Sequence, residues 1–216
     1  MNILHIDDHI LVLDKPAGLP VLPDGWDKDA PYLVKMLEAD YGRIWIVHRL
    51  DKNTSGVLLF ARNADAHRSL NIQFERHQAR KVYHALAEGS PRWEEHTARH
   101  PLRANVGHKH RTMVDNRSGK PAETNFRVLE RFKGFCLLEV IPETGRTHQV
   151  RVHAAELGHP LIADFLYGSH IDLGLARPAL HARSLTITHP ATNEPMSFES
   201  EYPADLLTVL RHARTG

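Results

Sequence analysis

The chain has 216 residues, of which 42% are hydrophobic and 25% charged, and its formal net charge is +1. This composition suits a soluble globular protein with a substantial core, and no apolar run approaches the ~20 residues that span a bilayer. The near-neutral charge excludes recognition of a partner by bulk electrostatics alone, and the single cysteine excludes an internal disulfide.

The first part of the chain predicts strands interrupted by two helices. Proline and glycine mark several of the ends, because proline cannot donate to a sheet ladder and glycine readily ends a helix. In order, the pattern predicts a hairpin over residues 3–6 and 10–13, a helix from Asp29 and Pro31 to Gly42 with Leu33, Met36 and Leu37 on one face, strands over 44–47 and 57–61, and a helix capped by Asn63 with Ala66, Leu70 and Phe74 at intervals of four.

The second part predicts mainly strands. In order, these elements are a strand over 82–87, a strand pair over 124–129 and 135–141 with Cys136 as a buried hydrophobe, a helix from Thr147 to Leu157 with Val150 and Ala154 facing the core, and a hairpin over 185–188 and 196–198. Hairpins outnumber strand–helix–strand crossovers. We therefore expect an α+β fold with a large, mostly antiparallel (mixed) sheet flanked by helices.

The loop between the strands at 44–47 and 57–61 concentrates reactive side chains. Its sequence is His48-Arg49-Leu50-Asp51-Lys52-Asn53-Thr54-Ser55-Gly56. It is longer than the roughly 2–5 residues that a simple hairpin needs, and loops between rigid strands often carry binding and catalytic side chains. A solvated turn with Asp51 as a cap is the alternative interpretation.

A second polar cluster lies at the predicted start of the third helix, in the run Glu143-Thr144-Gly145-Arg146-Thr147-His148-Gln149-Val150-Arg151-Val152-His153. Thr144 or Thr147 is a candidate cap, and His148 and Arg151 share one helix face. A helix N-terminus with these side chains suits a phosphate or carboxylate. An exposed helix with routine polar residues is the alternative.

Basic residues also gather at 76–81, 108–111 and 146–153. Local basic clusters on a near-neutral chain can follow a phosphate backbone. Each cluster taken alone is more typical of a solvated surface.

Taken together and in order, several of these motifs resemble the RluA-type family of RNA pseudouridine synthases. The resemblance covers roughly residues 3–200 and rests on Lys15-Pro16-Ala17-Gly18, the run from His48 to Gly56, Lys81-Val82-Tyr83, the run from Gly145 to His153, Leu180-His181-Ala182, and Thr188-His189-Pro190. One departure is Ile162-Ala163-Asp164, where the family commonly has glycine before the aspartate.

The resemblance implies roles for three residues in chemistry. Asp51 is the catalytic carboxylate, which either attacks the sugar or removes a sugar proton while uracil is detached and rejoined through C5. Arg151 pairs with Asp51 and holds it ionised and aimed. Tyr83 stacks on the uracil and approaches the reacting centre. These residues are expected to meet in one active-site cleft across the sheet.

The resemblance also implies roles in substrate binding. Arg49 enters the space that the flipped uridine leaves, which offsets part of the cost of extruding a base. Leu180 packs beneath the base. Arg146, His148 and Lys15 are expected to contact phosphates or support loops, and His48 to do either.

The implied organisation is a single catalytic domain over residues 1–216, without the S4-type RNA-binding domain of some relatives. We expect a cytoplasmic monomer that acts on a ribosomal or transfer RNA stem-loop, with no membrane partner. Neither a metal nor an organic cofactor is expected. The alternating His108 and His110 lack an acidic or cysteine ligand nearby.

Three other functions fit the sequence less well. A kinase loop places aspartate directly after arginine, whereas Leu50 intervenes here. A metal-dependent nuclease needs several clustered acids, and Asp51 stands alone in its loop. A catalytically silent RNA-binding module is the stronger rival, but such a module gains nothing from an acid beside phosphates.

Overall fold

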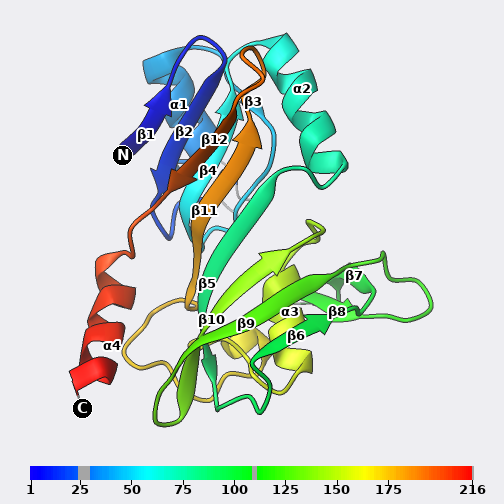
Figure 1. Ribbon diagram of the computed structural model, residues 1–216, viewed down its shortest axis with the longest axis vertical. Helices are drawn as coiled ribbons and strands as arrows, with labels where there is room; N and C mark the ends of the chain where they lie inside the picture. Colours follow the sequence, from blue (N-terminus) through cyan, green and yellow to red (C-terminus); the bar gives the residue numbers. More distant parts are fainter. Residues whose placement is uncertain (24–29, 109–110, 216) are drawn as a thin grey trace. The chain divides into compact units, whose positions relative to one another are not determined.

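The computed structural model describes residues 1–23, 30–108 and 111–215 (Figure 1). The chain divides into two compact units: the first comprises residues 1–81 and 182–201, and the second comprises 82–181 and the residues from Tyr202 onward. Each unit combines strands with helices, which confirms the predicted α+β class. The expectation of one catalytic domain over the whole chain stays a prediction.

The first unit is built on antiparallel strands. In it β2 lies between β1 and β4, β3 pairs with β4, and β12 pairs with β11. The bounds are Asn2–Ile6 for β1, Ile10–Lys15 for β2, Trp45–Ile46 for β3, Ser55–Ala61 for β4, Leu180–Thr188 for β11, whose first two residues belong to the second unit, and Pro195–Glu199 for β12. Both predicted hairpins are confirmed.

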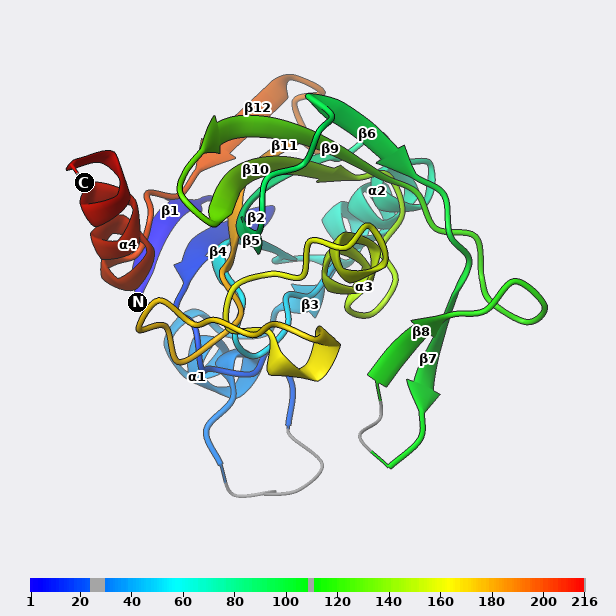
Figure 2. The same cartoon turned by 90° about the horizontal axis from the view of Figure 1, so that it is seen from below.

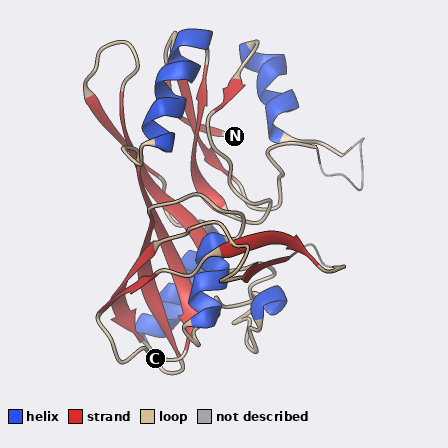
Figure 3. Cartoon of the chain, turned by 90° about the vertical axis from the view of Figure 1, so that its right-hand side faces the viewer, coloured by secondary structure: helices blue, strands red, loops and turns tan. Residues whose placement is uncertain are grey.

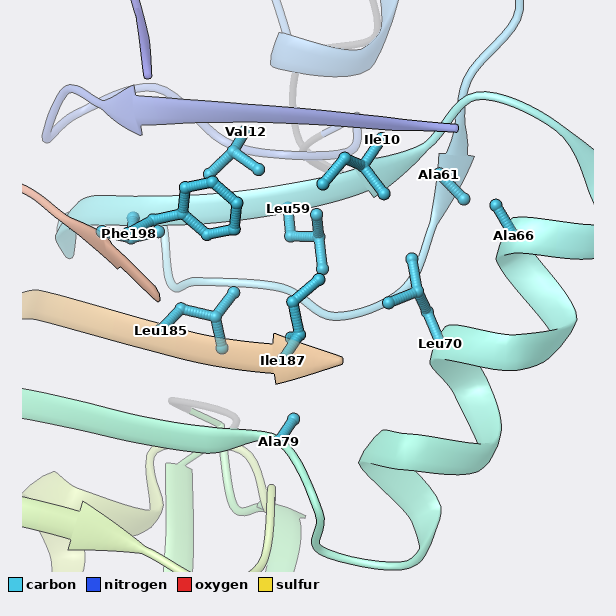
Figure 4. Close-up of a cluster of buried hydrophobic side chains, with 11 residues drawn as sticks. Ile10, Val12, Leu59, Ala61, Ala66, Leu70, Ala79, Leu185, Ile187 and Phe198 are labelled. Carbon is cyan, nitrogen blue, oxygen red and sulfur yellow. The ribbon is translucent and has the colours of Figure 1, made fainter. Parts of the chain in front are cut away.

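One face of these strands packs against α2 (Ala64–Glu75), which runs along β3 and β4 (Figures 1 and 4). Alternate residues of each strand enter the shared cluster, as the two-residue period of a strand requires. The cluster contains Ile10, Val12, Val57, Leu59, Ala61, Ala66, Leu70, Ala79, Leu185, Ile187 and Phe198. Asn63 caps α2 as predicted, since its side-chain oxygen accepts from the backbone N–H of Ala66 at 2.8 Å.

The other helix of this unit, α1, spans Leu33–Tyr41. Its Leu33 and Leu37 are buried, but Met36 is 40% exposed, so the prediction that all three share the buried face was wrong for Met36. The helix begins later than Pro31, and Asp29 lies outside the described residues.

The second unit has a four-stranded antiparallel sheet in the order β5-β10-β9-β6 and a separate β7–β8 hairpin. The bounds are Arg80–Glu88 for β5, Glu95–Ala98 for β6, Leu102–Val106 for β7, Arg111–Val114 for β8, Thr124–Arg131 for β9 and Phe135–Pro142 for β10. Its helices are α3 (Gln149–Glu156), the short 3-10 helix η1 (Phe165–Tyr167) and α4 (Ala204–Thr215). Figures 2 and 3 show α3 against one face of these strands.

Strand β10 is apolar except for Glu139, because helices cover both of its faces. Cys136 and Leu138 enter the cluster that contains Val150 of α3, whereas Phe135 and Leu137 enter the cluster that contains residues of α4. Cys136 has no exposed area, and burial raises the pKa of its thiol to about 11. No helix in the described ranges is long and apolar enough to cross a membrane.

Helix α3 begins two residues later than the predicted Thr147. His148 adopts a left-handed backbone conformation with φ of 53°, and no side chain caps the helix. The predicted caps at Thr144 and Thr147 were therefore wrong. Gln149 organises this turn instead, since its Oε1 accepts from the Arg146 backbone N–H at 3.0 Å and from Thr144 Oγ1 at 2.7 Å.

Gly56, in β4, lies close against the backbone of Ala182 in β11. It has φ of 113°, and a Cβ there would lie 2.2 Å from the carbonyl oxygen of Ala182. The three atoms nearest to such a Cβ are all backbone atoms of Ala182, so no flexible side chain can move aside. Only a residue without a side chain fits this position.

A Gly56→Ala variant is expected to lose more than about 4 kcal/mol of unfolding free energy or to fail to fold, because the clash adds to the backbone strain. Gly168→Ala is the matched control, since Gly168 also has positive φ (93°, left-handed) but a Cβ there would meet nothing within 4 Å. The control should lose only about 1–2 kcal/mol. Urea unfolding measures both, and similar losses would contradict the steric account.

His48 anchors the start of the loop between β3 and β4. Its Nε2 accepts from the backbone N–H of Leu59 at 3.1 Å, and its ring stacks on Phe74 with centroids 4.7 Å apart. The residue is partly exposed, but burial of the ring, followed by the nearby Lys81 charge, lowers the pKa of His48 to about 3. The ring is therefore neutral at physiological pH.

This shift predicts a pH-dependent loss of stability. The unfolded chain takes up a proton at His48 below its ordinary pKa of 6.5, whereas the folded chain does so only near 3, so stability falls as pH falls between these values. His48→Gln is the reference, because glutamine keeps a hydrogen-bond acceptor but does not titrate. Compared with it, the wild type should lose up to about 1.4 kcal/mol of unfolding free energy for each unit by which the pH falls. Urea unfolding across this pH range tests it, and parallel curves would refute it.

Candidate functional site

Residues 47–54 connect β3 to β4 and carry the acid that the sequence singled out. Asp51 is partly exposed and Arg49 is exposed, while Leu50 between them is buried. The carbonyl oxygen of Asp51 accepts from the Thr54 backbone N–H at 3.1 Å, which closes a tight turn. The loop thus holds its apolar residue inward and presents a carboxylate and a guanidinium.

Lys15 supports this loop from below. Its side chain has no exposed area, and its Nζ donates to the carbonyl oxygens of Pro16 (2.7 Å), Leu19 (2.8 Å) and Lys52 (3.0 Å). The Gly18 backbone N–H donates to the same Lys52 oxygen at 2.9 Å. Of the two roles expected for Lys15, complete burial favours loop support over phosphate contact. The neutral, hydrogen-bonded His48 likewise favours loop support.

Arg151 lies on α3 in the second unit and is held by a partner that sequence reasoning missed. Its Nε and Nη2 donate to Asp164 Oδ2 and Oδ1 at 2.7 and 2.8 Å, and Asp164 is 1% exposed. The guanidinium also lies over the Tyr167 ring, 4.9 Å from its centroid. A bidentate ion pair fixes the plane of a guanidinium, and Nη1 takes no part in it.

Tyr167 links this pair to the β7–β8 hairpin. Its hydroxyl accepts from the Thr112 backbone N–H at 2.9 Å and lies 2.7 Å from Nδ1 of His148. Burial raises the pKa of Tyr167, so the phenol remains neutral. For His148 these contacts favour loop support over phosphate contact. Arg146 is exposed, and its Nε donates to the Pro121 carbonyl at 3.1 Å.

Tyr83 and Leu180 belong to the same apolar region of the second unit. Tyr83 lies on β5 opposite Val140 and packs, partly buried, against the cluster that contains Leu180 and Val150. Leu180 is 5% exposed. One apolar cluster of this unit therefore includes the Leu180 side chain and part of the helix that carries Arg151, and the aromatic ring of Tyr83 packs against it.

The expected pairing of Asp51 with Arg151 in one cleft lined by Tyr83 stays a prediction, because Asp51 belongs to the first unit and the other two residues to the second. Arg49 likewise belongs to the first unit, and its place in the space of a flipped base stays a prediction.

No grouping of three or more His, Cys, Asp or Glu side chains that could hold a metal ion occurs among the described residues. Of the alternating histidines considered for a metal, His108 is exposed and His110 lies outside the described residues.

The chain is similar in sequence to known RNA pseudouridine synthases. Residues 9–156 match the family model described as RNA pseudouridylate synthase. The chain is 34% identical to "Ribosomal large subunit pseudouridine synthase D" of Haemophilus ducreyi over 100% of this chain and 71% of that protein. It is 42% identical to an uncharacterised RNA pseudouridine synthase of Zymomonas mobilis over 94% of each.

A solved structure of human RNA pseudouridylate synthase domain containing 4 covers 99% of this chain and 93% of its own, with a TM-score of 0.80 and 26% identity. The family match spans both the Asp51 loop and α3. On this evidence the chain belongs to the RNA pseudouridine synthase family of isomerases, as its RluA-type motifs indicated.

Proposed function

We propose that this protein converts specific uridines of structured ribosomal RNA to pseudouridine, with Asp51 as the catalytic carboxylate. The Haemophilus relative is named as a ribosomal large subunit enzyme, which supports ribosomal RNA over transfer RNA as the substrate. A ribosomal RNA substrate places the enzyme in the cytoplasm. The observation that carries the proposal is that Asp51 is partly exposed on a loop that the buried Lys15 holds through a hydrogen bond to the Lys52 carbonyl.

The reaction is an isomerisation and needs no co-reactant. The bond between N1 of uracil and C1′ of ribose breaks, the base rotates, and a bond between C5 and C1′ forms. The hydrogen displaced from C5 is lost as a proton, and N1 gains one, so atoms and electrons balance. Asp51 serves either as a nucleophile at the sugar or as a base that removes a sugar proton.

The other residues prepare the substrate. An extruded uracil needs an aromatic surface and an apolar support, and Tyr83 beside Leu180 supplies both. Arg49 is exposed two positions before Asp51 on the same loop, and we expect it to occupy the gap that the flipped uridine leaves in the RNA. Arg151, oriented by Asp164, supplies the positive charge that keeps the catalytic carboxylate ionised.

Asp51→Asn should abolish pseudouridine formation while leaving RNA affinity within about twofold, because the amide keeps the size of the carboxylate but neither attacks nor takes a proton. The measurements are pseudouridine mapping on ribosomal and transfer RNA transcripts and filter binding of the same RNA.

Asp40→Asn, on the exposed end of α1, is the matched control and should retain full activity. Unchanged product formation by Asp51→Asn would remove Asp51 from the chemistry. Product on transfer RNA alone would replace the proposed substrate.

Arg151→Lys should lower kcat by about tenfold or more, since a lysine keeps the charge but loses the planar fork. It should also cost about 2 kcal/mol of unfolding free energy, because Asp164 loses one of two charge-assisted hydrogen bonds. Single-turnover rates, measured well below the melting temperature, separate the two effects.

Asp164→Asn is the companion variant and should destabilise by about 3 kcal/mol, because it leaves a buried guanidinium without its carboxylate. If Arg151→Lys is destabilised but retains the wild-type single-turnover rate, Arg151 supports the fold and takes no part in the reaction.

A further inference from the structure

A pocket of about 410 Å³ lies in the second unit and is lined in part by the β7–β8 hairpin. Its lining comes from three separate segments: the hairpin strands, the loop that follows β8 and the turn that precedes α3. The volume is in the range of small-ligand sites. None of the residues assigned to the chemical step lines it.

Three cationic side chains, one from each segment, line this pocket: Arg103, Lys120 and Arg146. All three residues are exposed. Arg103 pairs with Asp115, Nε to Oδ2 at 3.0 Å, and Arg146 donates to the carbonyl oxygen of Pro121, which carries no formal charge. The residues that line the pocket include these three cations and no carboxylate, so the lining itself carries positive charge.

Hydroxyl groups complete the lining, from Thr112, Ser118 and Thr147. Thr112 is 1% exposed, so protein encloses its hydroxyl, whereas Ser118 and Thr147 are exposed and can donate to a bound group. Cations and hydroxyls together select an anion with several oxygen atoms.

We propose that this pocket binds a backbone phosphate of the substrate RNA and so anchors the RNA away from the reacting uridine. The inference rests on the proposed function, because RNA is then the source of the phosphate. Guanidinium groups suit phosphate oxygens, and a lysine adds a flexible point charge. The volume leaves room for the sugar that adjoins the phosphate.

Lys120→Ala tests the site, since Lys120 is exposed and its loss leaves the Arg103–Asp115 pair in place. Binding of a ribosomal RNA transcript should weaken by about threefold to tenfold, and the slope of log affinity against log salt should shrink by about 0.7–0.9, the value for one phosphate contact. Under turnover the loss should appear in KM more than in kcat. Lys120→Arg should restore both binding and slope.

Lys133→Ala is the matched control, because Lys133 is an exposed lysine of the same unit outside the pocket. If Lys120→Ala and Lys133→Ala bind RNA alike with equal salt slopes, the proposal is overturned. It is also overturned if inorganic phosphate raises the melting temperature of the wild type but not of Lys120→Ala while RNA affinity is the same for both, since the pocket then serves a free phosphate compound.

These results are independent of catalysis. Wild-type protein that binds RNA without forming pseudouridine would contradict the proposed function. The comparison of RNA binding by Lys120→Ala and Lys133→Ala would still show whether the pocket binds a phosphate of the RNA. Pseudouridine formation with unchanged RNA binding by Lys120→Ala would defeat the pocket alone.

Discussion

A fully buried ammonium group holds the loop that carries Asp51. Removing the Lys15 charge from water is costly unless its donors are satisfied, and three backbone carbonyls surround it, one of them from Lys52 directly after Asp51. Two of these carbonyls, those of Pro16 and Leu19, belong to the segment after β2, and the third belongs to the Asp51 loop. If either segment moved away, the ammonium group would lose hydrogen bonds. The backbone next to the acid is therefore restrained before any substrate arrives, as preorganised catalysis requires.

The second unit restrains its side chains in a similar way. Arg151 is fixed by the buried carboxylate of Asp164 on one side and lies over Tyr167, whose hydroxyl is in turn held by the β7–β8 hairpin and His148. Each chemical group is thus aligned by a neighbour from another segment. Support of this kind limits the motion of the Arg151 side chain.

The sequence predicted those parts of the fold that depend on short-range patterns. The β1–β2 hairpin, the Asn63 cap and the β9–β10 pair follow from period, capping and turn chemistry. It did not predict the late start of α3, since nothing in the residue type announces a left-handed His148. It missed Asp164 because a partner thirteen residues away across irregular chain leaves no periodic signal. The resemblance to known motifs supplied Asp51, Arg151 and, as a candidate loop support, Lys15, but not the Asp164 carboxylate that holds Arg151.

Cys136 has a practical consequence. A thiol that lies in a sealed apolar layer and titrates near 11 presents almost no thiolate to solvent. Alkylating and maleimide reagents should therefore not react with Cys136 in the folded protein. A single cysteine engineered onto either unit becomes a unique attachment point for a dye or spin label, with no need to mutate the natural residue.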